Sequence, residues 1–343
     1  LMINDQSGNG VAVSVNNYAE GNLLLSGVSV DAEYDRVHDK LIAITTSALL
    51  KVDLKERTLE SVTLEHTANC LSVSTDGESA IVGHHSAMTL VDLSSMQVEE
   101  NYEVTTDVLD IILAPNNWVY AFPRTDQWQY IRCINLADGS EVNHTGFMIY
   151  AGTKAKLHPS GKYIYGANNG VVPSDAEKYD IQEGRANYLY HSPYHGDHEF
   201  YGQIWLADDG LKLLSRGNNI FNLSETKATD LIYTGTLPVA NKWVHAADFC
   251  TSKNRIGVVF YDYDIFNGIE PQNSVNFFDA TDYTYVEEKL FLNLIVQTGT
   301  GLESVPALGQ SGFFDSTGTT FYAIVNSGSK GLIQQWAVAT IHL

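Results

Sequence analysis

Three histidines in one short stretch are the residues of this sequence whose types and spacing could do chemistry. Positions 190–199 read Tyr-His-Ser-Pro-Tyr-His-Gly-Asp-His-Glu, which brings imidazole, carboxylate and phenol groups together. Transition metals accept imidazole and carboxylate ligands, although neither the helical nor the CxxC spacing of common zinc sites is present. The same rings could stack on a sugar, or could hold a loop together through hydrogen bonds and aromatic contacts. We predict ligand-binding residues in this stretch at Tyr190, His191, Tyr194, His195, Asp197 and His198.

A second stretch offers oxygen ligands. Asp262 and Asp264 alternate along the chain and are followed by Asn267 and a glycine. Ca²⁺ prefers hard oxygen ligands, and such a sequence can wrap around it. An EF-hand-like loop would need a further oxygen ligand where this chain has Phe266, although Glu270 is near. We therefore expect a Gly-terminated turn and no cofactor, with a calcium ion at Asp262, Asp264 and Asn267 as the alternative.

The sequence contains no arrangement for nucleophilic catalysis. The Gly-x-Ser-x-Gly motif of a nucleophile elbow does not occur. Residues 328–331 read Gly-Ser-Lys-Gly, but they lack the strand-to-helix context of a phosphate-binding loop. We assign no catalytic residue and expect a protein that is not an enzyme. The open alternative is a lactonase-like or metal-assisted hydrolase that uses the histidines above.

An internal repeat defines the elements that position these residues. An apolar–Asp/Asn–apolar tripeptide recurs at steps of 39, 43, 45, 42 and 57 residues, and a degenerate seventh copy follows 58 residues later. Turn-forming pairs such as Asp76-Gly77 run in phase with it, each before a β-branched or aromatic run. We expect the central side chains of the tripeptides to bond backbone amides two residues on. These central residues are Asp53, Asp92, Asn135, Asp180, Asn222 and Asp279, with Ala337 in the degenerate copy.

A repeat of about 40–45 residues with four strands is typical of a propeller blade. Seven copies predict a single all-β domain over residues 1–343, a seven-bladed β-propeller of four-stranded antiparallel blades. Radial stacking would bury both faces of every sheet. The last unit ends after its third strand, so we expect residues 1–26 to supply its outer strand and close the ring. The predicted blades span residues 27–65, 66–104, 105–149, 150–192, 193–238, 239–298 and 299–343.

Two segments resemble known propellers. Residues 157–168, Leu-His-Pro-Ser-Gly-Lys-Tyr-Ile-Tyr-Gly-Ala-Asn, resemble a recurrent stretch of YVTN-type propellers. Residues 194–224 are similar to a blade in propeller modules of large bacterial surface proteins with Ig-like repeats. Together with the repeat register, the resemblance spans residues 27–343 at the level of the fold. It implies an extracellular or cell-surface module of a bacterial or archaeal protein with a binding, adhesion or structural role, and it implies no particular ligand.

Lactonase-type propellers that act on sugar phosphates share the His-Pro-Ser-Gly-Lys-Tyr-Ile-Tyr stretch at residues 158–165. The match fails where their chemistry would sit. Residues 152–155 read Gly-Thr-Lys-Ala in place of a Gly-Pro-Arg-His-like run, and Asn168 and Asn169 replace an acidic residue. An anionic substrate also suits a strongly acidic surface poorly. This resemblance leaves the lactonase-like enzyme as an alternative.

The chain carries 41 Asp and Glu against 20 Lys and Arg, a formal net charge of −21. Such a surface repels phosphate backbones and anionic lipids, so we expect no nucleic-acid partner. The longest apolar run, residues 41–50, is interrupted by hydroxyl residues and is too short for membrane insertion. Three well-separated cysteines form no metal or disulfide pattern, which predicts buried thiols.

In a propeller, the connections between second and third strands, and those from an outer strand to the next inner strand, emerge on one face. The register places residues 190–199 there, with His84, His85, Asn168 and Arg216, and we predict this face as the ligand-binding surface. The leading hypothesis is a non-enzymatic extracellular binding or scaffold module that presents this face to a protein or glycan partner. We expect neighbouring domains or subunits of a larger assembly. A structural subunit of a filament or shell is the second alternative.

Overall fold

The computed structural model describes residues 2–4, 10–12, 21–125, 127–168, 173–262 and 271–343. Within these ranges the chain forms β-strands and two single-turn 3₁₀-helices, η1 (Lys227–Thr229) and η2 (Thr251–Lys253). β-Branched and aromatic residues between turn-forming pairs favour this outcome, because their side chains pack well on a pleated, half-buried surface. None of the described helices is long and apolar enough to cross a membrane.

Five sheets have four antiparallel strands each. The first contains β4 (Ser29–Asp35), β5 (Lys40–Thr45), β6 (Ala48–Asp53) and β7 (Thr58–Thr63). The second contains β15 (Lys154–Leu157), β16 (Tyr163–Ala167), β17 (Ala176–Asp180) and β18 (Asn187–His191). The third contains β19 (Ile204–Leu206), β20 (Lys212–Ser215), β21 (Asn219–Asn222) and β22 (Ile232–Thr236). The fourth contains β23 (Lys242–Cys250), β24 (Arg255–Asp262), β25 (Ser274–Asp279) and β26 (Tyr285–Leu290). The fifth contains β29 (Leu308–Phe314), β30 (Thr320–Asn326), β31 (Trp336–His342) and β3 (Leu23–Leu25).

A further sheet has seven strands, because one long strand belongs to two neighbouring groups. This strand, β11, runs for 18 residues, and its first part pairs with β10 while its second part pairs with β12. The strands are β8 (Cys70–Val73), β9 (Ser79–Gly83), β10 (His85–Asp92), β11 (Gln97–Ala114), β12 (Trp118–Pro123), β13 (Arg132–Asn135) and β14 (Glu141–Asn143).

The prediction of seven separate four-stranded sheets is not confirmed, because the structure has five such sheets and one seven-stranded sheet. It placed a boundary between residues 104 and 105, inside β11. Residues 103–108 contain neither Gly nor Pro, and Val104, Thr105 and Thr106 are β-branched, so the backbone stays extended. The Thr105 amide donates a hydrogen bond to a Glu141 carboxylate oxygen at 2.9 Å, which fixes the crossing point against β14.

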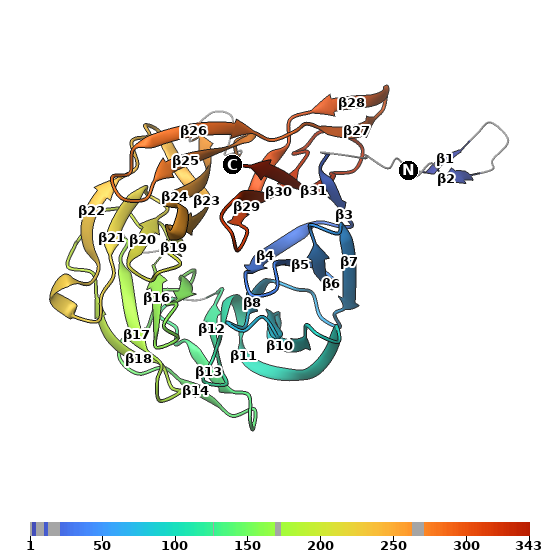
Figure 1. Ribbon diagram of the computed structural model, residues 1–343. Helices are drawn as coiled ribbons and strands as arrows, with labels where there is room; N and C mark the ends of the chain where they lie inside the picture. The colour runs from blue at the N-terminus through green and yellow to red at the C-terminus, as the bar shows by residue number, and fades with distance from the viewer. Residues whose placement is uncertain (1, 5–9, 13–20, 126, 169–172, 263–270) are drawn as a thin grey trace.

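The sheets stand around a central axis as the blades of an all-β propeller (Figure 1). Each innermost strand contacts the next one, which closes the ring around the axis. The innermost strands are β4, β8, the second part of β11, β15, β19, β23 and β29. The prediction of an all-β propeller built from four-stranded antiparallel units is confirmed.

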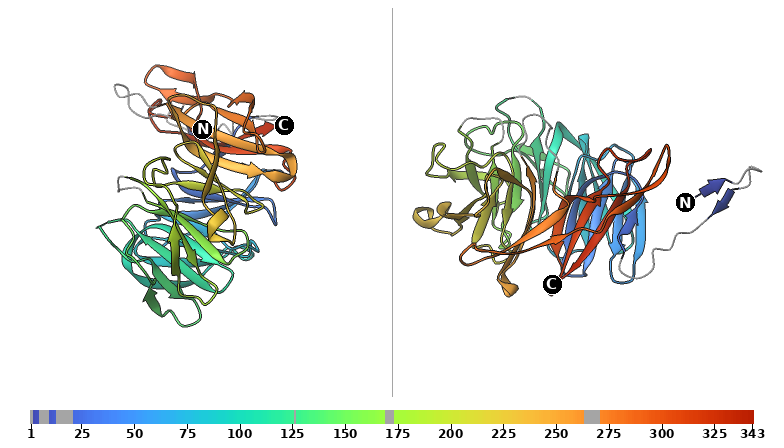
Figure 2. Two further views of the ribbon diagram at one scale, coloured as in Figure 1. Left: turned by 90° about the vertical axis from the view of Figure 1, so that its left-hand side faces the viewer. Right: turned by 90° about the horizontal axis from the view of Figure 1, so that it is seen from above.

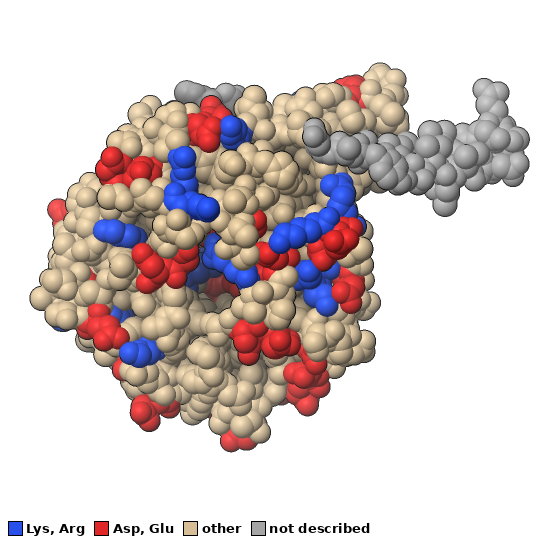
Figure 3. All heavy atoms as spheres, viewed as in Figure 1, with Lys and Arg blue, Asp and Glu red and all other residues tan. Residues whose placement is uncertain are grey.

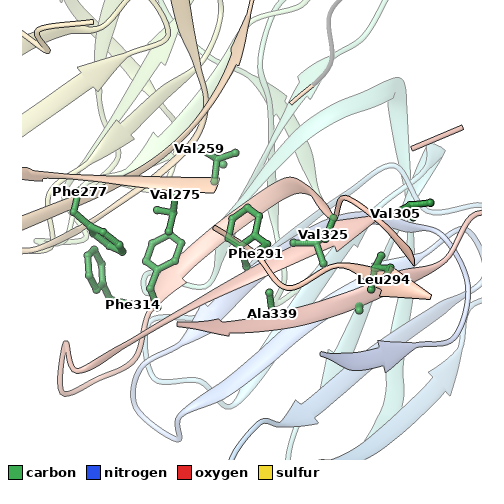
Figure 4. Packing of buried hydrophobic residues seen from close by; sticks show 14 of the residues in the cluster. Val259, Val275, Phe277, Phe291, Leu294, Val305, Phe314, Val325 and Ala339 are labelled. Atoms are coloured by element: carbon green, nitrogen blue, oxygen red, sulfur yellow. The ribbon is translucent and has the colours of Figure 1, made fainter. Parts of the chain in front are cut away.

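Apolar side chains fill the wedges between neighbouring sheets. Figure 4 shows the cluster between the β23–β26 sheet and the sheet that contains β29. Phe277 of β25 packs edge-to-face against Phe321 of β30, with ring centroids 5.5 Å apart, and Phe314 of β29 lies beside both rings. Radial stacking thus buries the faces that a single four-stranded sheet would leave in water.

The two ends of the chain meet in one sheet. Leu23 of β3 lies opposite Val338 of β31, so the N-terminal strand forms the outer strand of the last sheet. Two small hairpins lie outside the four-stranded sheets. They are β1 (Met2–Asn4) with β2 (Gly10–Ala12), and β27 (Leu294–Thr298) with β28 (Gly301–Val305).

The repeated Asp or Asn has the predicted turn role in five of the six copies, the exception being Asn222, whose side-chain oxygen accepts a bond from Lys212 instead. The Asp53 carboxylate accepts hydrogen bonds from the amides of Lys55 and Glu56, at 3.0 and 2.8 Å. Asp92, Asn135, Asp180 and Asp279 accept equivalent bonds from amides two residues on. These bonds satisfy the amides of each turn between third and fourth strands. The cysteines Cys70, Cys133 and Cys250 are buried free thiols, as the sequence predicts.

Candidate functional site

The ring has two faces of different construction. We call the loop face the one formed by connections from second to third strands and from outer strands to the next inner strand. The opposite turn face carries the tight turns and the C-terminus, since the Leu343 amide bonds the carbonyl of Thr319 in the turn between β29 and β30. The right-hand view of Figure 2 has the loop face upward, and Figure 3 looks onto the turn face.

Tyr190 is tied into the protein interior. Its hydroxyl donates a hydrogen bond to Asp230 at 2.9 Å, and Tyr165 donates to the same carboxylate at 3.0 Å. The carboxylate also forms an ion pair of 2.9 Å with Lys178, and both charged side chains are almost completely buried. Burial, reinforced by the Asp230 charge, raises the pKa of Tyr190. Tyr190 therefore helps to bind two neighbouring sheets to each other.

The remaining predicted residues of 190–199 hold their own loop. The His191 imidazole lies 2.7 Å from an Asp175 oxygen, and its ring lies 5.8 Å from the ring of His195. His198 stacks on Tyr233, with centroids 4.0 Å apart and planes 9° from parallel. The Tyr194 hydroxyl accepts a bond from the Tyr233 amide at 2.9 Å, and Asp197 accepts one from the His195 amide at 3.3 Å. The hydrogen-bonded aromatic loop that the sequence left open as an alternative fits these contacts.

These side chains do not converge on one point that would suit a metal. Among the described residues, no group of three or more His, Cys, Asp or Glu side chains is arranged to hold a metal ion. For the calcium prediction, Asp264 and Asn267 lie outside the described residues. Asp262 ends β24, and its backbone pairs with Lys242.

His84 and Asn168 also find partners within the chain. The two ring nitrogens of buried His84 lie 3.0 Å from the Thr67 carbonyl and 2.9 Å from the Thr89 hydroxyl. Burial lowers the pKa of His84, which keeps the imidazole neutral near pH 7. The Asn168 amide oxygen accepts a bond from Thr153 at 3.0 Å. His85 is exposed on the same face, with a ring nitrogen 3.5 Å from Asp107.

Arg216 is a partly buried member of the predicted set and packs on an aromatic ring. It follows β20 directly, and its guanidinium carbon lies 5.0 Å from the centroid of the Tyr261 ring. Its Nε and the Tyr261 hydroxyl are buried without hydrogen-bond partners in the described part of the chain. Tyr201 and Trp243 stack beside them with centroids 4.4 Å apart, and Trp243 meets Tyr261 edge-on at 5.9 Å. Of these aromatic residues, sequence reasoning found none.

The central channel is a second region that sequence reasoning missed. It contains two cavities of about 400 and 320 Å³, and both are lined by Glu33, Arg36 and Lys156. In Figure 3 the centre of the ring is hollowed, and acidic and basic atoms lie at its mouth. The signal was present in the sequence as alternating charges, Asp31 with Glu33 and Lys154 with Lys156, because alternate residues of an innermost strand point to the axis.

Carboxylates of the channel connect neighbouring sheets. Asp31 and Glu33 of β4 accept hydrogen bonds from the amides of Leu71 and Val73 of β8, at 3.0 and 2.8 Å. Equivalent bonds run to Asp110 from Ala155, at 2.7 Å, and to Asp248 from Phe314, at 2.7 Å. Arg36 forms an ion pair with Asp248. These contacts give the channel acids a structural role.

Burial changes the protonation of this region. Burial raises the pKa of Glu33 to about 7, although Lys156 and the Val73 amide oppose the shift. Burial would lower the pKa of Lys156, but the charges of Glu33, Asp110 and Asp31 outweigh it and raise that pKa. The channel therefore holds a lysine that stays charged and a glutamate that titrates near neutrality.

Comparison with known proteins supports the propeller fold. No family model matches the sequence, and no curated protein matches it. The β-propeller domain of Cps50 (Swd1) from Myceliophteria thermophila is similar in structure, with a TM-score of 0.65 and 13% sequence identity over 92% of this chain and 97% of that chain. Hydrazine synthase of Kuenenia stuttgartiensis is also similar, with a TM-score of 0.59 and 12% identity over 95% of this chain and 99% of that chain. At these identities the likeness shows the propeller fold alone.

Proposed function

We propose that this chain is a non-enzymatic binding and scaffold module that acts outside the cell and presents its loop face to a protein partner. The proposal counts seven blades, because β11 serves once as the outer strand beside β10 and once as the inner strand beside β12. It assigns no catalytic step and no cofactor. The resemblance of residues 157–168 to YVTN-type propellers supports the extracellular location.

The distribution of exposed apolar side chains is the observation that carries the proposal. Among the described residues of connecting segments, with the β27–β28 hairpin counted as one of them, nine large apolar side chains are exposed on the loop face and two on the turn face. Exposed apolar patches on a soluble protein mark interaction surfaces. The loop-face residues are Val28, Trp128, Phe147, Met148, Leu292, Ile295, Leu302, Leu332 and Ile333. The turn-face residues are Val37 and Leu211.

The most exposed of these residues suit a protein partner better than a small ligand. Phe147 is 77% exposed and Ile333 is 80% exposed, so each stands out from the surface instead of lining a cavity. Trp128 and Phe147 project from the connections beside β12–β14, and Ile333 projects from the connection between β30 and β31. Several separated anchors of this kind fit a broad contact, in which a few aromatic residues carry most of the affinity.

A pair of matched variants tests the proposal. The loop-face variant replaces Trp128, Phe147 and Ile333 with Ser, and the control variant replaces Val37 and Leu211 with Ser on the turn face. Circular dichroism first checks that both variants fold. Immobilised protein captures partners from a cell-surface and secreted protein fraction, and affinity is then measured with the purified partner. We expect the loop-face variant to bind at least about tenfold more weakly, and the control to bind as the parent does.

Equal binding by both variants would place the contact elsewhere and reject the proposal. Turnover of a lactone or ester by the purified parent chain would reject the non-enzymatic assignment. If the parent chain binds a glycan array, the loop-face variant does not, and no protein partner is captured, the partner is a sugar and not a protein.

A further inference from the structure

One position of the loop face is occupied by a polar residue in four successive units. It lies directly after the second strand, and the residue just before the inner strand of the same unit faces it. The facing pairs are Asn69 with His84, Asp107 with Arg124, Thr153 with Asn168, and Gln203 with Arg216, as the strand registers require. In the first three units, the side chain after the second strand has a hydrogen-bond or ion-pair partner in the chain.

Arg124 and Arg216 show the difference between paired and open versions of this position. The Arg124 amide bonds the Asp107 carbonyl at 2.8 Å, and the Arg216 amide bonds the Gln203 carbonyl at 3.0 Å, so the two backbones are equivalent. The Arg124 Nε lies 3.5 Å from an Asp107 carboxylate oxygen. In the other unit a neutral amide, Gln203, replaces that carboxylate. The described residues form no ion pair with Arg216, although acids outnumber bases two to one in this chain.

Three buried polar side-chain atoms in this part of the molecule have no hydrogen-bond partner among the described residues. They are the Arg216 Nε, the Tyr261 hydroxyl and the Asn218 side-chain oxygen. The Tyr261 side chain is fully buried, and Asn218 is 6% exposed. Leaving such groups unsatisfied is costly, so proteins seldom keep them without a ligand or an ordered water. Two of the three groups, on Arg216 and Tyr261, are hydrogen-bond donors that lack an acceptor.

The walls around these donors are aromatic, and the Glu199 carboxylate lies close to the Tyr201 hydroxyl at their edge. The stacked rings of Tyr201 and Trp243 form one wall, and His245 meets Tyr261 edge-on at 5.8 Å. Burial, followed by the Arg216 charge, lowers the pKa of His245 to about 4, so this imidazole is neutral at pH 7. His245 and Gln203 also line the channel cavity of about 320 Å³. A ligand at Arg216 therefore meets an aromatic surface formed by Tyr261, Trp243 and Tyr201.

We propose that Arg216 and Tyr261 bind a carboxylate carried on an aromatic or apolar group, with Tyr201 and Trp243 packing against that group. The planar guanidinium fork matches a carboxylate, and a tyrosine hydroxyl can donate a further bond to it. A doubly charged phosphate fits less well, because Asp31 lines the same cavity as His245 and the whole chain is acidic. The site deepens the proposed function, since it lies on the loop face and would accept the C-terminus of a partner or a free acid.

Direct binding of small probes to the purified chain tests this site without any protein partner. The probes are 3-phenylpropanoate and its amide, and the peptide acetyl-Gly-Gly-Gly-Phe as free acid and as amide. Isothermal titration calorimetry should show binding of the acids and at least about tenfold weaker binding of the amides. Tighter binding of the peptide acid than of phenylpropanoate would identify a chain terminus as the source of the carboxylate, and the reverse would identify a free acid.

Variants assign the contacts. Arg216→Gln should weaken binding of the acids at least about tenfold, and Arg216→Lys, which keeps the charge but loses the fork, should weaken it less. Tyr261→Phe should weaken acid binding with little change in thermal stability, because no described residue accepts a hydrogen bond from its hydroxyl. Arg124→Gln, the matched control on the same face, should leave binding unchanged.

Amides that bind as well as acids, or an Arg216→Gln variant that binds both acids like the parent, would overturn the proposal. Failure of the proposed protein-binding function would leave these small-probe results intact. Failure of the probes would leave the test with Trp128, Phe147 and Ile333 unaffected. The two proposals can therefore fail separately.

Discussion

A buried cation and a partly buried cation in neighbouring units of the ring have opposite surroundings. Lys178 is surrounded by groups from its own chain, with Asp230 at 2.9 Å, the Ser224 carbonyl at 2.7 Å and the face of Tyr163 at 4.2 Å. Arg216 has an aromatic ring beneath it and no ion pair among the described residues. A cation that is paired with an acid of the next sheet joins the two sheets. A cation without such a pair can bind a ligand instead. The difference separates scaffold from site within one repeat architecture.

Breaking the Lys178–Asp230 ion pair should have the largest effect. Asp230→Asn leaves the Lys178 ammonium buried without a counter-charge, and we expect the free energy of unfolding to fall by about 3–5 kcal/mol. Urea denaturation followed by circular dichroism measures the change. The control is Glu225→Gln, which removes the exposed partner of Lys162 and should leave the transition unchanged. A small loss for Asp230→Asn would mean that Lys178 does not depend on this carboxylate.

The channel glutamate gives an intermediate case, a buried acid bonded to a backbone amide instead of a cation. Its folded-state pKa is about 7, above the usual 4.5, so the unfolded chain loses this proton first as the pH rises. Stability should therefore fall between pH 4.5 and pH 7, by up to about 3 kcal/mol from this group. Denaturation of the parent and of Glu33→Gln across this window measures the difference. Parallel pH profiles for the two proteins would contradict the raised pKa.

Giving Arg216 an ion-pair partner within the chain should remove its ability to bind a ligand. Gln203→Asp places a carboxylate where Asp107 lies in the equivalent unit, and that carboxylate should compete with a bound acid for Arg216. We expect the dissociation constant of 3-phenylpropanoate to rise about tenfold, equivalent to about 1.4 kcal/mol. The control is Asp107→Asn, which frees Arg124 at the other position and should leave the affinity unchanged. Unaltered binding by Gln203→Asp would show that the ligand does not use Arg216.

The smallest effect should come from the paired arginine itself. The Arg124–Asp107 contact is 3.5 Å long and partly exposed, so Arg124→Gln should cost less than about 1 kcal/mol in unfolding free energy. Arg216→Gln has no ion pair to lose and should leave the unfolding transition in place. Parallel urea titrations compare them. A larger loss for Arg216→Gln would reveal a structural partner for this guanidinium.

Much of the fold could be predicted from the sequence because its turns and strands depend on residues that are close together in the chain. The Asp or Asn of most tripeptides, as at Asp53, bonds amides of its own turn, and the strands around it follow from local residue types. The junction inside β11 could not be predicted in this way. The repeat required a loop after residue 104, while Val104, Thr105 and Thr106 favoured an extended chain, and the local preference prevailed. The β27–β28 hairpin was not predicted, and the predicted blade boundary between residues 298 and 299 falls inside it.

The candidate site was harder to predict because the role of each residue depends on contacts with residues that are distant in the sequence. Residue type placed Tyr190 among ligand-binding candidates, yet its partner Asp230 is 40 residues away. Arg216 was placed on the loop face for its position, but its importance depends on Gln203 standing where another unit has Asp107. Aligning the units by the residue before each inner strand would have revealed that exchange. Tyr261 and Trp243 carried no such signal.

The shared strand β11 has a mechanical consequence. Elsewhere in the ring, adjoining sheets are separate and are joined by connecting segments. The strand groups β8–β10 and β12–β14, on either side of Thr105, instead share the continuous strand β11. We expect these two groups to tilt as a single rigid plate. We then expect motions that widen the central channel to concentrate at the other junctions between sheets. We also expect the pairing of β3 with β31 to open easily, because it is short.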